Sequence, residues 1–515
     1  VGFANTQKQI PKKRLLINTL EALYGSEILN EKKIRQLVLS TLDEKTLIYL
    51  ARKYSSKVYD KPYDNALQLS LIPWKGGSDF VVEIADLLNI PIDDLPIINQ
   101  YDAPTTEEVY PFSKLNPLHN YQYELKKRIL DYLNNGYKRF LVQMPTGSGK
   151  TRTVMESVIE FCNSTNFFKK TQSVIWIAHT EELCEQAIET LVYLWPHLST
   201  YTLRLTRFWG SHTPEIYNLK GGFVFGTFQK LASLAKGESS VIKYFKNYPQ
   251  IVVIDEAHKS LAKSYLSLIN TILINESTLL IGITATPGRG ASSVEENIEL
   301  AEIFDKQLVS PTFTENPIIA LRKIGVLSYL KRTIINTNIH VSLQRSQTVE
   351  AGALEEISKG TLLRLSKNKV RNKLILELID RQIQEGNPSL VFSCNTEHSK
   401  LLHAALYFKG IKSHYLDSST PKFKRKKIIE DFKTAKVDVL INYGILTTGF
   451  DAPRIKTLII TRPTSSIILY SQMIGRGLRG PQMGGSYACN LFDLRDNFLN
   501  FGGVERVYNF FEGYW

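Results

Sequence analysis

The sequence predicts an α/β protein with two tandem doubly wound parallel sheets, preceded by a small helical domain. Two alternating blocks lead to this prediction. Short apolar segments alternate with helical stretches from residue 109 to about 312, and again from about 371 to 480. Such alternation is typical of parallel sheets covered by helices. The length of 515 residues allows about three domains, each with its own core.

The first 108 residues are predicted to form a helical accessory domain. Apolar residues recur there at three- and four-residue spacing, and capping residues precede two of the segments. The predicted helices are Lys12–Tyr24, Ile28–Leu42, Glu44–Tyr54 after the cap Asp43, and Phe80–Leu88 after Ser78 and Asp79. Prolines at 91, 96 and 104 indicate a linker. No catalytic set of residues occurs here, and a docking surface for a protein or nucleic acid is the alternative.

Strands are predicted wherever a short apolar run is bounded by polar or turn residues. In the first block these are Phe140–Gln143, Ser173–Ala178, Phe223–Thr227, Ile251–Ile254 and Thr278–Thr284. In the second block they are Leu390–Cys394, Lys412–Leu416, Val437–Asn442 and Lys456–Thr461. Between the blocks, Ile334–Val341 is predicted as a strand and Glu350–Leu365 as a helix. The predicted domains are 1–108, 109–312, 313–480, and a tail, 481–515, that packs on the second sheet.

Composition restricts the classes of function. The net charge of +13 and the isoelectric point of about 9.2 favour a polyanionic partner such as nucleic acid. The cysteines at 162, 184, 394 and 489 show no C-x-x-C pairing, so neither a zinc site nor a disulfide framework is predicted. A reducing, cytoplasmic setting fits this pattern. The apolar runs are too short to span a bilayer, so no membrane partner is expected.

A glycine-rich turn between a predicted strand and a predicted helix is the segment on which the functional prediction depends. It runs from Met144 through Pro145 and then through Thr146, Gly147, Ser148, Gly149, Lys150 and Thr151. Glycines let backbone N–H groups surround phosphate oxygens, and the helix N-terminus favours negative charge. Lys150 is expected to reach the outer phosphates of a nucleotide triphosphate, and the Thr151 hydroxyl to bind Mg²⁺. Met144 stands where the common pattern has its first glycine.

Two adjacent carboxylates end another apolar strand, Ile251–Ile254. Ligands bind at the carboxyl ends of strands in open α/β sheets. Asp255 is therefore predicted to hold Mg²⁺ through water, and Glu256 to orient and deprotonate the attacking water. The alternative for Asp255 is a helix cap.

Two further motifs close the two blocks. Thr284-Ala285-Thr286-Pro287 follows the last predicted strand of the first block. The segment from Gln472 to Gly480 closes the second and carries Arg476 and Arg479, which are three residues apart and would face the same way on a helix. Their planar guanidinium groups suit the charge that develops on a transferring γ-phosphoryl group.

With these motifs in this order, the chain from about Leu118 to Gly480 resembles superfamily 2 helicases and translocases. Asp255-Glu256-Ala257-His258 spells the DEAH box, and the segment from Asn442 to Pro453 is similar to motif V. The overall pattern most resembles double-stranded DNA translocases of the RadD, XPB and type I restriction motor group. The resemblance implies two RecA-like domains with an ATP site between them. It also implies double-stranded or branched DNA as the partner; antiviral defence belongs to the alternative in which the chain is a motor subunit.

The resemblance also implies roles for single residues. Gln122 would read adenine, Gly449 and Asp451 would contact the nucleotide, and His258 would link the DEAH box to Gln472 across the cleft. Thr284 and Thr286 would couple the nucleotide site to the nucleic-acid site. The residues implied to contact the nucleic-acid backbone are His179, Thr180, Thr227, Gln229, Ser393, Asn395, Thr447 and Thr448.

The predicted activity is ATP-dependent movement along DNA, with ATP and Mg²⁺ held by the first block and the two arginines supplied by the second. Two alternatives remain. In the first, the chain is a nucleic-acid-sensing ATPase or the motor subunit of a restriction or antiphage complex, and residues 1–108 dock it to a partner. In the second, it is an RNA helicase. A ring ATPase or transporter motor is disfavoured, because these lack paired arginines after a second sheet in the same chain.

Overall fold

The computed structural model describes residues 28–29, 31–74, 78–88, 105–109, 115, 117–170, 172–235, 239–288, 294–337, 357–444, 454–464 and 466–495. By its internal contacts the chain divides into two compact units. One comprises residues 1–102 and 397–437, and the other comprises residues 103–396 and 438–515. The glycine-rich turn, the carboxylate pair and the paired arginines all lie in the second of these units.

The helical domain has its own apolar core, in which Leu47, Leu50 and Trp74 are buried. Its described helices are α2 (Lys32–Leu39), α3 (Glu44–Tyr54), α4 (Pro62–Ser70) and α5 (Asp79–Leu88). The predicted cap on α3 is confirmed, since the Asp43 carboxylate accepts a hydrogen bond from the Thr46 amide at 3.0 Å. The predicted helix Lys12–Tyr24 and the proline linker lie outside the described residues.

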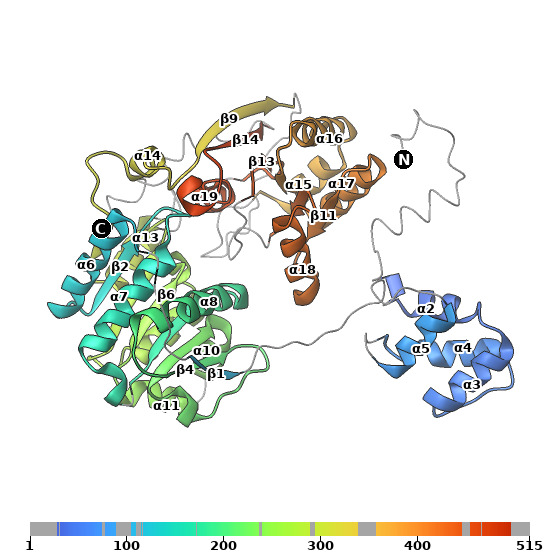
Figure 1. Cartoon of the computed structure of the whole chain (residues 1–515), viewed down its shortest axis with the longest axis horizontal. Coiled ribbons are helices and arrows are strands. Elements are labelled where there is room, and N and C mark those ends of the chain that lie inside the picture. Colours follow the sequence, from blue (N-terminus) through green and yellow to red (C-terminus); the bar gives the residue numbers. More distant parts are fainter. Residues whose placement is uncertain are drawn as a thin grey trace. The chain divides into compact units, whose positions relative to one another are not determined.

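The first α/β domain is built on an eight-stranded sheet in the order β1-β4-β5-β3-β6-β7-β2-β8 (Figure 1). Its strands are β1 (Thr106–Val109), β2 (Arg139–Gln143), β3 (Val174–Ala178), β4 (Leu203–Phe208), β5 (Gly222–Thr227), β6 (Ile251–Asp255), β7 (Leu279–Thr284) and β8 (Leu308–Val309). All described pairings are parallel except that of β1 with β4, which is antiparallel. The sheet therefore has the predicted doubly wound form, with one antiparallel edge.

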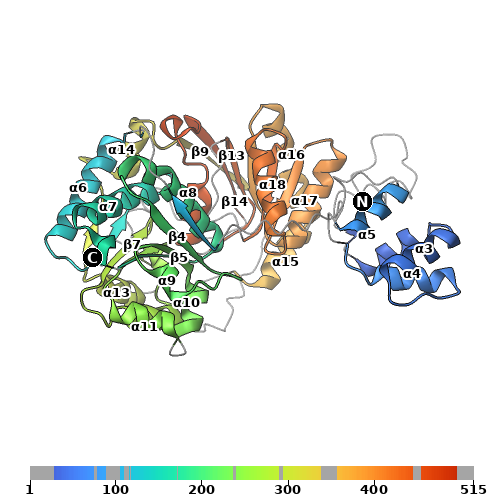
Figure 2. The ribbon, with the colours of Figure 1, turned by 60° about the horizontal axis from the view of Figure 1, so that its bottom comes forward.

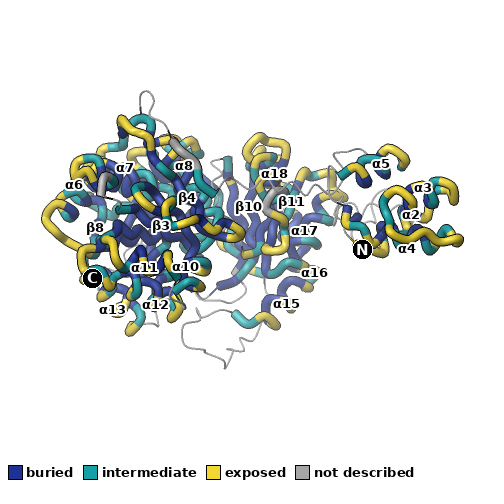
Figure 3. The backbone as a smooth tube through the Cα atoms, turned by 90° about the horizontal axis from the view of Figure 1, so that it is seen from below, coloured by how far each residue is buried: buried dark blue, intermediate teal, exposed yellow. Residues whose placement is uncertain are grey.

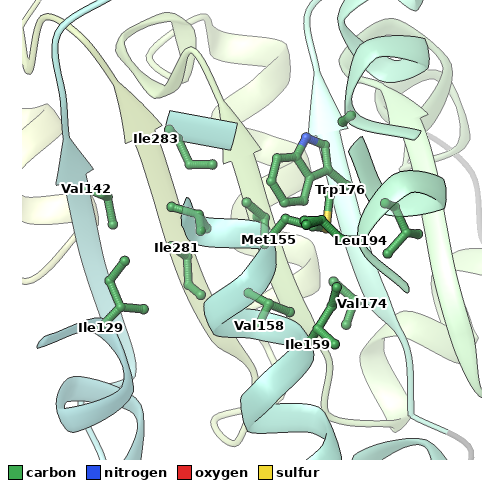
Figure 4. Packing of buried hydrophobic residues seen from close by; sticks show 14 of the residues in the cluster. Ile129, Val142, Met155, Val158, Ile159, Val174, Trp176, Leu194, Ile281 and Ile283 are labelled. Atoms are coloured by element: carbon green, nitrogen blue, oxygen red, sulfur yellow. The ribbon is translucent and has the colours of Figure 1, made fainter. Parts of the chain in front are cut away.

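Helices cover both faces of this sheet (Figure 2). They are α6 (Asn120–Asn134), α7 (Lys150–Ser164), α8 (Glu181–Leu198), α9 (Ile216–Leu219), α10 (Phe228–Ala235), α11 (Ser240–Asn247), α12 (Lys263–Ile272), α13 (Val294–Ile303) and α14 (Pro317–Lys323), with short 3₁₀ turns at Phe167–Lys170 and Ala257–Lys259. Alternate strand residues divide between two clusters. Val174 and Trp176 pack with α6, α7 and α8 (Figure 4), whereas Ile175 and Ile177 pack with α10, α11 and α12. This two-sided burial explains why the strands are continuous apolar runs.

The second α/β domain contains a six-stranded sheet in the order β11-β12-β10-β13-β14-β9. Its strands are β9 (Tyr329–Asn336), β10 (Ser389–Phe392), β11 (Ser413–Leu416), β12 (Val439–Asn442), β13 (Thr457–Ile460) and β14 (Ala488–Arg495). Its helices are α15 (Lys359–Lys367), α16 (Lys369–Gln384), α17 (Thr396–Phe408), α18 (Lys422–Lys433) and α19 (Ile467–Gly475), followed by a 3₁₀ turn at Pro481–Met483. Strands such as β10 are buried along their length, while the helices keep an exposed side (Figure 3).

The structure differs from the sequence-based division at the C-terminal end. Residues 481–515 were expected to pack on the second sheet, but β14 lies inside it and pairs in parallel with both β13 and β9. β14 contains polar residues such as Asn490 and Asp493, so the segment lacks the apolar run of a central strand. The Asn490 side-chain amide instead donates to Gln382 at 3.0 Å. The aromatic residues after 495 lie outside the described residues.

Candidate nucleotide and nucleic-acid site

The glycine-rich turn joins β2 to α7, as predicted. Gly147 and Gly149 have φ angles of +84° and +83°, a backbone conformation that side chains with a Cβ adopt only under strain. The Ser148 amide and hydroxyl both bond to the Pro145 carbonyl, at 3.3 and 2.7 Å, which closes the turn. Lys150 and Thr151 are the first residues of α7, so the turn ends at a helix N-terminus that favours an anion.

The N-terminal turn of α6 supports this glycine-rich turn. The Tyr121 hydroxyl and the Gln122 side-chain amide donate to the Ser148 carbonyl, at 2.7 and 3.0 Å. A Cβ added at Gly149 would lie 2.3 Å from Gln122 Nε2, so a side chain at residue 149 would displace this amide. Gln122 also accepts a bond from the His119 amide at 3.0 Å. The structure therefore brings Gln122 onto the turn, where the resemblance expects an adenine-reading glutamine.

Asp255 ends the buried strand β6, and Glu256, the next residue, has a strained backbone. Its φ and ψ of 53° and 51° are left-handed, which is uncommon for a residue with a long side chain and is typical of functional sites. The Asp255 carboxylate accepts a hydrogen bond from the Glu256 amide at 2.9 Å. This bond fixes one carboxylate, and the left-handed turn then redirects the chain at the next residue.

Burial and mutual charge shift the pKa values of three groups here. Burial lowers the pKa of Lys150, although the charges of Glu256 and Asp255 oppose the change. Burial and the neighbouring Glu256 raise the pKa of Asp255 to about 7. Burial alone would raise the pKa of Glu256, but the positive charges of His258, Lys150 and Lys259 outweigh it and lower the pKa. These groups therefore form one electrostatic cluster, in which positive charges surround the carboxylate pair.

His258 joins this cluster to the next motif. Its Nδ1 lies 3.0 Å from the Thr284 hydroxyl and 3.3 Å from a Glu256 carboxylate oxygen. The Thr284 hydroxyl donates to the Thr286 carbonyl at 2.9 Å and accepts from the Thr286 amide at 3.1 Å. Because the hydroxyl hydrogen is used in that bond, this network assigns the proton at the contact to His258 Nδ1.

The two arginines follow α19 in a segment that packs directly on the glycine-rich turn. A Cβ added at Gly475 would lie 2.7 Å from Thr146 Cγ2. A Cβ added at Gly147 would lie 3.8 Å from Arg479 Cγ. The positive charges of Arg476 and Arg479 also act on the pKa of Lys150. The paired arginines are therefore near the glycine-rich turn, as the sequence predicted.

Gln472 also lies on α19, but the structure gives it no bond to His258. Its side-chain nitrogen is buried and has no hydrogen-bond partner among the described residues. The link between Gln472 and His258 stays a prediction.

Two of the residues implied to contact nucleic acid in the first domain, His179 and Gln229, meet at Tyr265, on α12. The Tyr265 hydroxyl lies 3.4 Å from His179 Nδ1 and interacts with the Gln229 side chain. Thr180 directly precedes α8, and Thr227 directly precedes α10. Their hydroxyls accept hydrogen bonds from the amides of Leu183 and Lys230, three residues later in each case. The structure thus brings two of the four predicted residues of the first domain together, and the other two are helix caps.

The predicted contacts in the second domain are arranged differently. Ser393 is fully buried, and its hydroxyl donates to the carbonyls of Asn395 and Asn442, both at 3.2 Å. Asn395 is partly exposed and donates to the Ser366 hydroxyl at 3.0 Å. A direct contact from the Ser393 hydroxyl to a phosphate would require these bonds to break. Thr447, Thr448, Gly449 and Asp451 lie outside the described residues.

Sequence analysis missed Tyr121, Tyr265 and Lys259. Lys259 carries a charge that acts on both Glu256 and His179, between the two parts of the site. The signals were weak, because a tyrosine beside a glutamine or a lysine after a DEAH box has many structural roles. Only long-range contacts give these residues a functional position.

Two family models match the chain. One, described as the Res subunit of type III restriction enzymes, matches residues 116–289, and the helicase conserved C-terminal domain matches residues 370–480. These two segments contain the glycine-rich turn and the paired arginines. No helix in the described part of the chain is long and apolar enough to cross a membrane.

Several known proteins are similar in sequence or structure. A Saccharomyces cerevisiae protein named as the ATP-dependent helicase IRC3 is 29% identical over 70% of this chain and 49% of its own length. A Schizosaccharomyces pombe protein named as a mitochondrial ATP-dependent helicase is 27% identical over 75% and 58%. An HsdR fragment of a Vibrio vulnificus type I restriction enzyme matches in structure with a TM-score of 0.51 and 20% identity, covering 74% of this chain and 65% of that one.

The chain spans about half the length of the two yeast relatives. The Vibrio structure supports the fold alone, that is, two tandem RecA-like domains. An Escherichia coli type I restriction endonuclease subunit is also similar, at 19% identity over 73% of this chain and 46% of that protein. With both family models matching and the motifs in order, the chain belongs to the superfamily 2 helicases.

Proposed function

We propose that this chain is a nucleic-acid-stimulated ATPase that moves along DNA. The observation that carries the proposal is the packing of the arginine segment on the glycine-rich turn, with Gly475 against Thr146 and Gly147 against Arg479. An ATP site of this kind is complete only when both domains contribute. Opening and closing of the domains can then be tied to hydrolysis.

The roles proposed within the site follow from charge and position. Lys150 neutralises the outer phosphates, and the amides of the glycine-rich turn bind their oxygens. Glu256 orients the attacking water and accepts its proton, and its lowered pKa keeps it ionised for this role. Arg476 and Arg479 stabilise the charge that develops on the γ-phosphoryl group.

The donor set fits Mg²⁺, which prefers oxygen ligands and keeps several of its waters. Asp255 supplies a buried carboxylate whose pKa is raised by burial and by Glu256, so its ionised form is disfavoured and a bound divalent cation would stabilise it. Thr151 supplies a hydroxyl at the start of α7. Asp255 and Thr151 would hold the ion, which supplies charge neutralisation between the outer phosphates.

Nucleic acid is proposed to bind across both domains through its backbone. His179 and Gln229, joined by Tyr265, are the proposed contacts in the first domain, with Asn395 and Thr447 and Thr448 in the second. The net charge of +13 supports a polyanionic partner. Backbone contacts carry no sequence information, and their strength falls with salt.

A restriction or antiphage setting is the second candidate, in which the chain is a motor or sensor subunit. It is favoured by the restriction-subunit family model and by the similarity to a type I restriction subunit. The helical domain, with its separate core, would then dock a partner protein. An RNA helicase is the third candidate. A cytoplasmic location stays a prediction, since one relative is named as mitochondrial.

An ATPase panel tests these alternatives. Steady-state ATP hydrolysis would be measured with blunt duplex, forked and branched DNA, single-stranded DNA and RNA, each at two salt concentrations. DNA translocation predicts the strongest stimulation by duplex or branched DNA and weaker stimulation at high salt. The same assay with Lys150→Ala and Glu256→Gln should show no stimulated turnover. Stimulation by RNA alone would favour the third candidate, and wild-type turnover by Glu256→Gln would remove Glu256 as the base.

A further inference from the structure

The segment 325–328, between α14 and β9, runs beside the loop that carries Arg479. Leu327 and Arg479 form an isolated antiparallel bridge. The Ser328 amide donates to the Leu478 carbonyl at 2.8 Å, just before this arginine. The main chain of Arg479 is therefore held by the segment that leads from the first sheet to the second.

The loop is held after the arginine as well. The Gly480 amide donates to the Val326 carbonyl at 2.9 Å, and the Gln482 amide donates to the Gly325 carbonyl at 3.0 Å. A Cβ added at Gly480 would lie 2.2 Å from the Gly325 oxygen. The two backbones thus approach too closely for any side chain at residue 480, and main-chain bonds fix both neighbours of Arg479.

Ser328 adds a side-chain bond to this arrangement. Its hydroxyl is within hydrogen-bond distance of the Arg479 carbonyl, and it lies 2.5 Å from the Ser486 carbonyl. Ser328 is almost fully buried, so no water replaces these bonds. The hydroxyl has one hydrogen, which the two carbonyls share. It therefore contacts both ends of the arginine loop, that is, the segment from Arg479 to Ser486.

The segment is itself anchored in the first domain. Val326 and Leu327 are buried in the cluster that contains Met144, the residue at the start of the glycine-rich turn, and Leu478 belongs to the same cluster. The amides of Val326 and Leu327 bond to the Leu321 carbonyl, at 2.9 and 3.1 Å. Arg479 is thus attached, through this segment, to the core beneath the phosphate-binding turn.

We propose that segment 325–328 positions Arg479 for ATP hydrolysis, with the Ser328 hydroxyl as the positioning group. This inference rests on the proposed function, because it assigns Arg479 a role at the γ-phosphoryl group. Ser328 does not touch the nucleotide. It fixes the carbonyl of Arg479, and therefore the main-chain position from which the Arg479 side chain extends to the site. Small misplacements of a catalytic group are costly, with about 1 Å able to lower a rate roughly 100-fold.

The test is a double-mutant cycle measured by nucleic-acid-stimulated ATP hydrolysis of the full chain. Ser328→Ala should lower kcat about tenfold and change KM for ATP less than about twofold, because binding by Lys150 is untouched. Ser328→Thr keeps the hydroxyl and should recover most of the rate. In an Arg479→Ala background, Ser328→Ala should have no further effect, because both changes remove the same contribution.

A matched control separates positioning from folding. Ser389→Ala removes another fully buried hydroxyl that donates to a main-chain carbonyl, at 3.0 Å, in the second sheet. It should lower thermal stability about as much as Ser328→Ala and leave kcat unchanged. Additive effects of Ser328→Ala and Arg479→Ala would overturn the proposal, as would a normal kcat for Ser328→Ala. Stimulated hydrolysis that survives Lys150→Ala would instead overturn the proposed function.

Discussion

His258 Nδ1 lies 3.0 Å from the Thr284 hydroxyl, which in turn bonds twice to the main chain of Thr286. His258 also lies 3.3 Å from Glu256, the proposed base. The carboxylate pair and the threonine motif are thus connected by one histidine. Such a connection is suited to transmit the state of the nucleotide to the nucleic-acid contacts.

Thr284→Val should uncouple hydrolysis from movement. Valine keeps the shape but removes the hydroxyl that bonds to His258 and Thr286. We expect ATP hydrolysis within about threefold of the wild type and DNA translocation at least about tenfold slower, a loss in the range of measured coupling energies. Translocation would be measured by displacement of a third strand from duplex DNA. Thr271→Val, on the exposed side of α12, is the matched control. Equal losses in both assays would contradict a coupling role.

Gly475→Ala should hinder closure of the ATP site. The new methyl group would lie 2.7 Å from Thr146 Cγ2, so the arginine segment must move away from the glycine-rich turn. We expect kcat to fall about 100-fold, since a displacement of about 1 Å is enough for such a loss. Gly360→Ala has open space around the added Cβ and serves as the control. Similar kcat values for the two variants would show that the contact with Thr146 is dispensable.

Gln122→Ala should weaken nucleotide binding and selection. It removes the amide that bonds to the Ser148 carbonyl and packs on Gly149. We expect KM for ATP to rise about tenfold, the equivalent of one buried hydrogen bond to a charged or constrained group. The preference for ATP over GTP should fall as well. Tyr123→Phe, at the exposed neighbour, should change neither quantity. An unchanged ATP preference in Gln122→Ala would leave this residue a structural role only.

His179 should make stability depend on pH. Burial and the charge of Lys259 lower its pKa to about 4, whereas its ordinary value is 6.5. Between these two pH values His179 is protonated in the unfolded chain but neutral in the folded one. The free energy of unfolding therefore falls as pH falls through this window. In His179→Gln no side chain at this position takes up a proton. The Tm of the wild type should therefore drop more than that of His179→Gln between pH 7.5 and pH 5. Parallel Tm curves would contradict the buried, neutral histidine.

Local signals explain which parts of the fold were predictable. Helix Glu44–Tyr54 was predicted at its observed bounds, because a cap at Asp43 and an apolar spacing act within a few residues. Strand β4 was missed. Its sequence, LRLTRF, contains Arg204, Thr206 and Arg207 and so lacks an apolar run, and the buried Arg207 has its Nε 3.0 Å from Glu185. Such a strand depends on a partner that is distant in sequence.

The candidate site shows the same contrast between local sequence signals and contacts that are distant in sequence. The glycine-rich turn and the carboxylate pair are short contiguous motifs, so sequence alone identified them. The packing of Gly475 on Thr146 joins two distant segments, and no local pattern encodes it. The bond of Ser328 to the arginine loop is of the same kind, since a single serine after a helix carries no signal of its own.

The account depends on the arginines of the second domain acting at the nucleotide of the first. Single-turnover ATP hydrolysis by Arg476→Ala and Arg479→Ala, at saturating ATP and nucleic acid, tests this most directly. Nucleotide affinity should stay within about threefold of the wild type, while the hydrolysis rate falls at least about 1,000-fold. A hydrolysis rate close to that of the wild type in both variants would contradict the account.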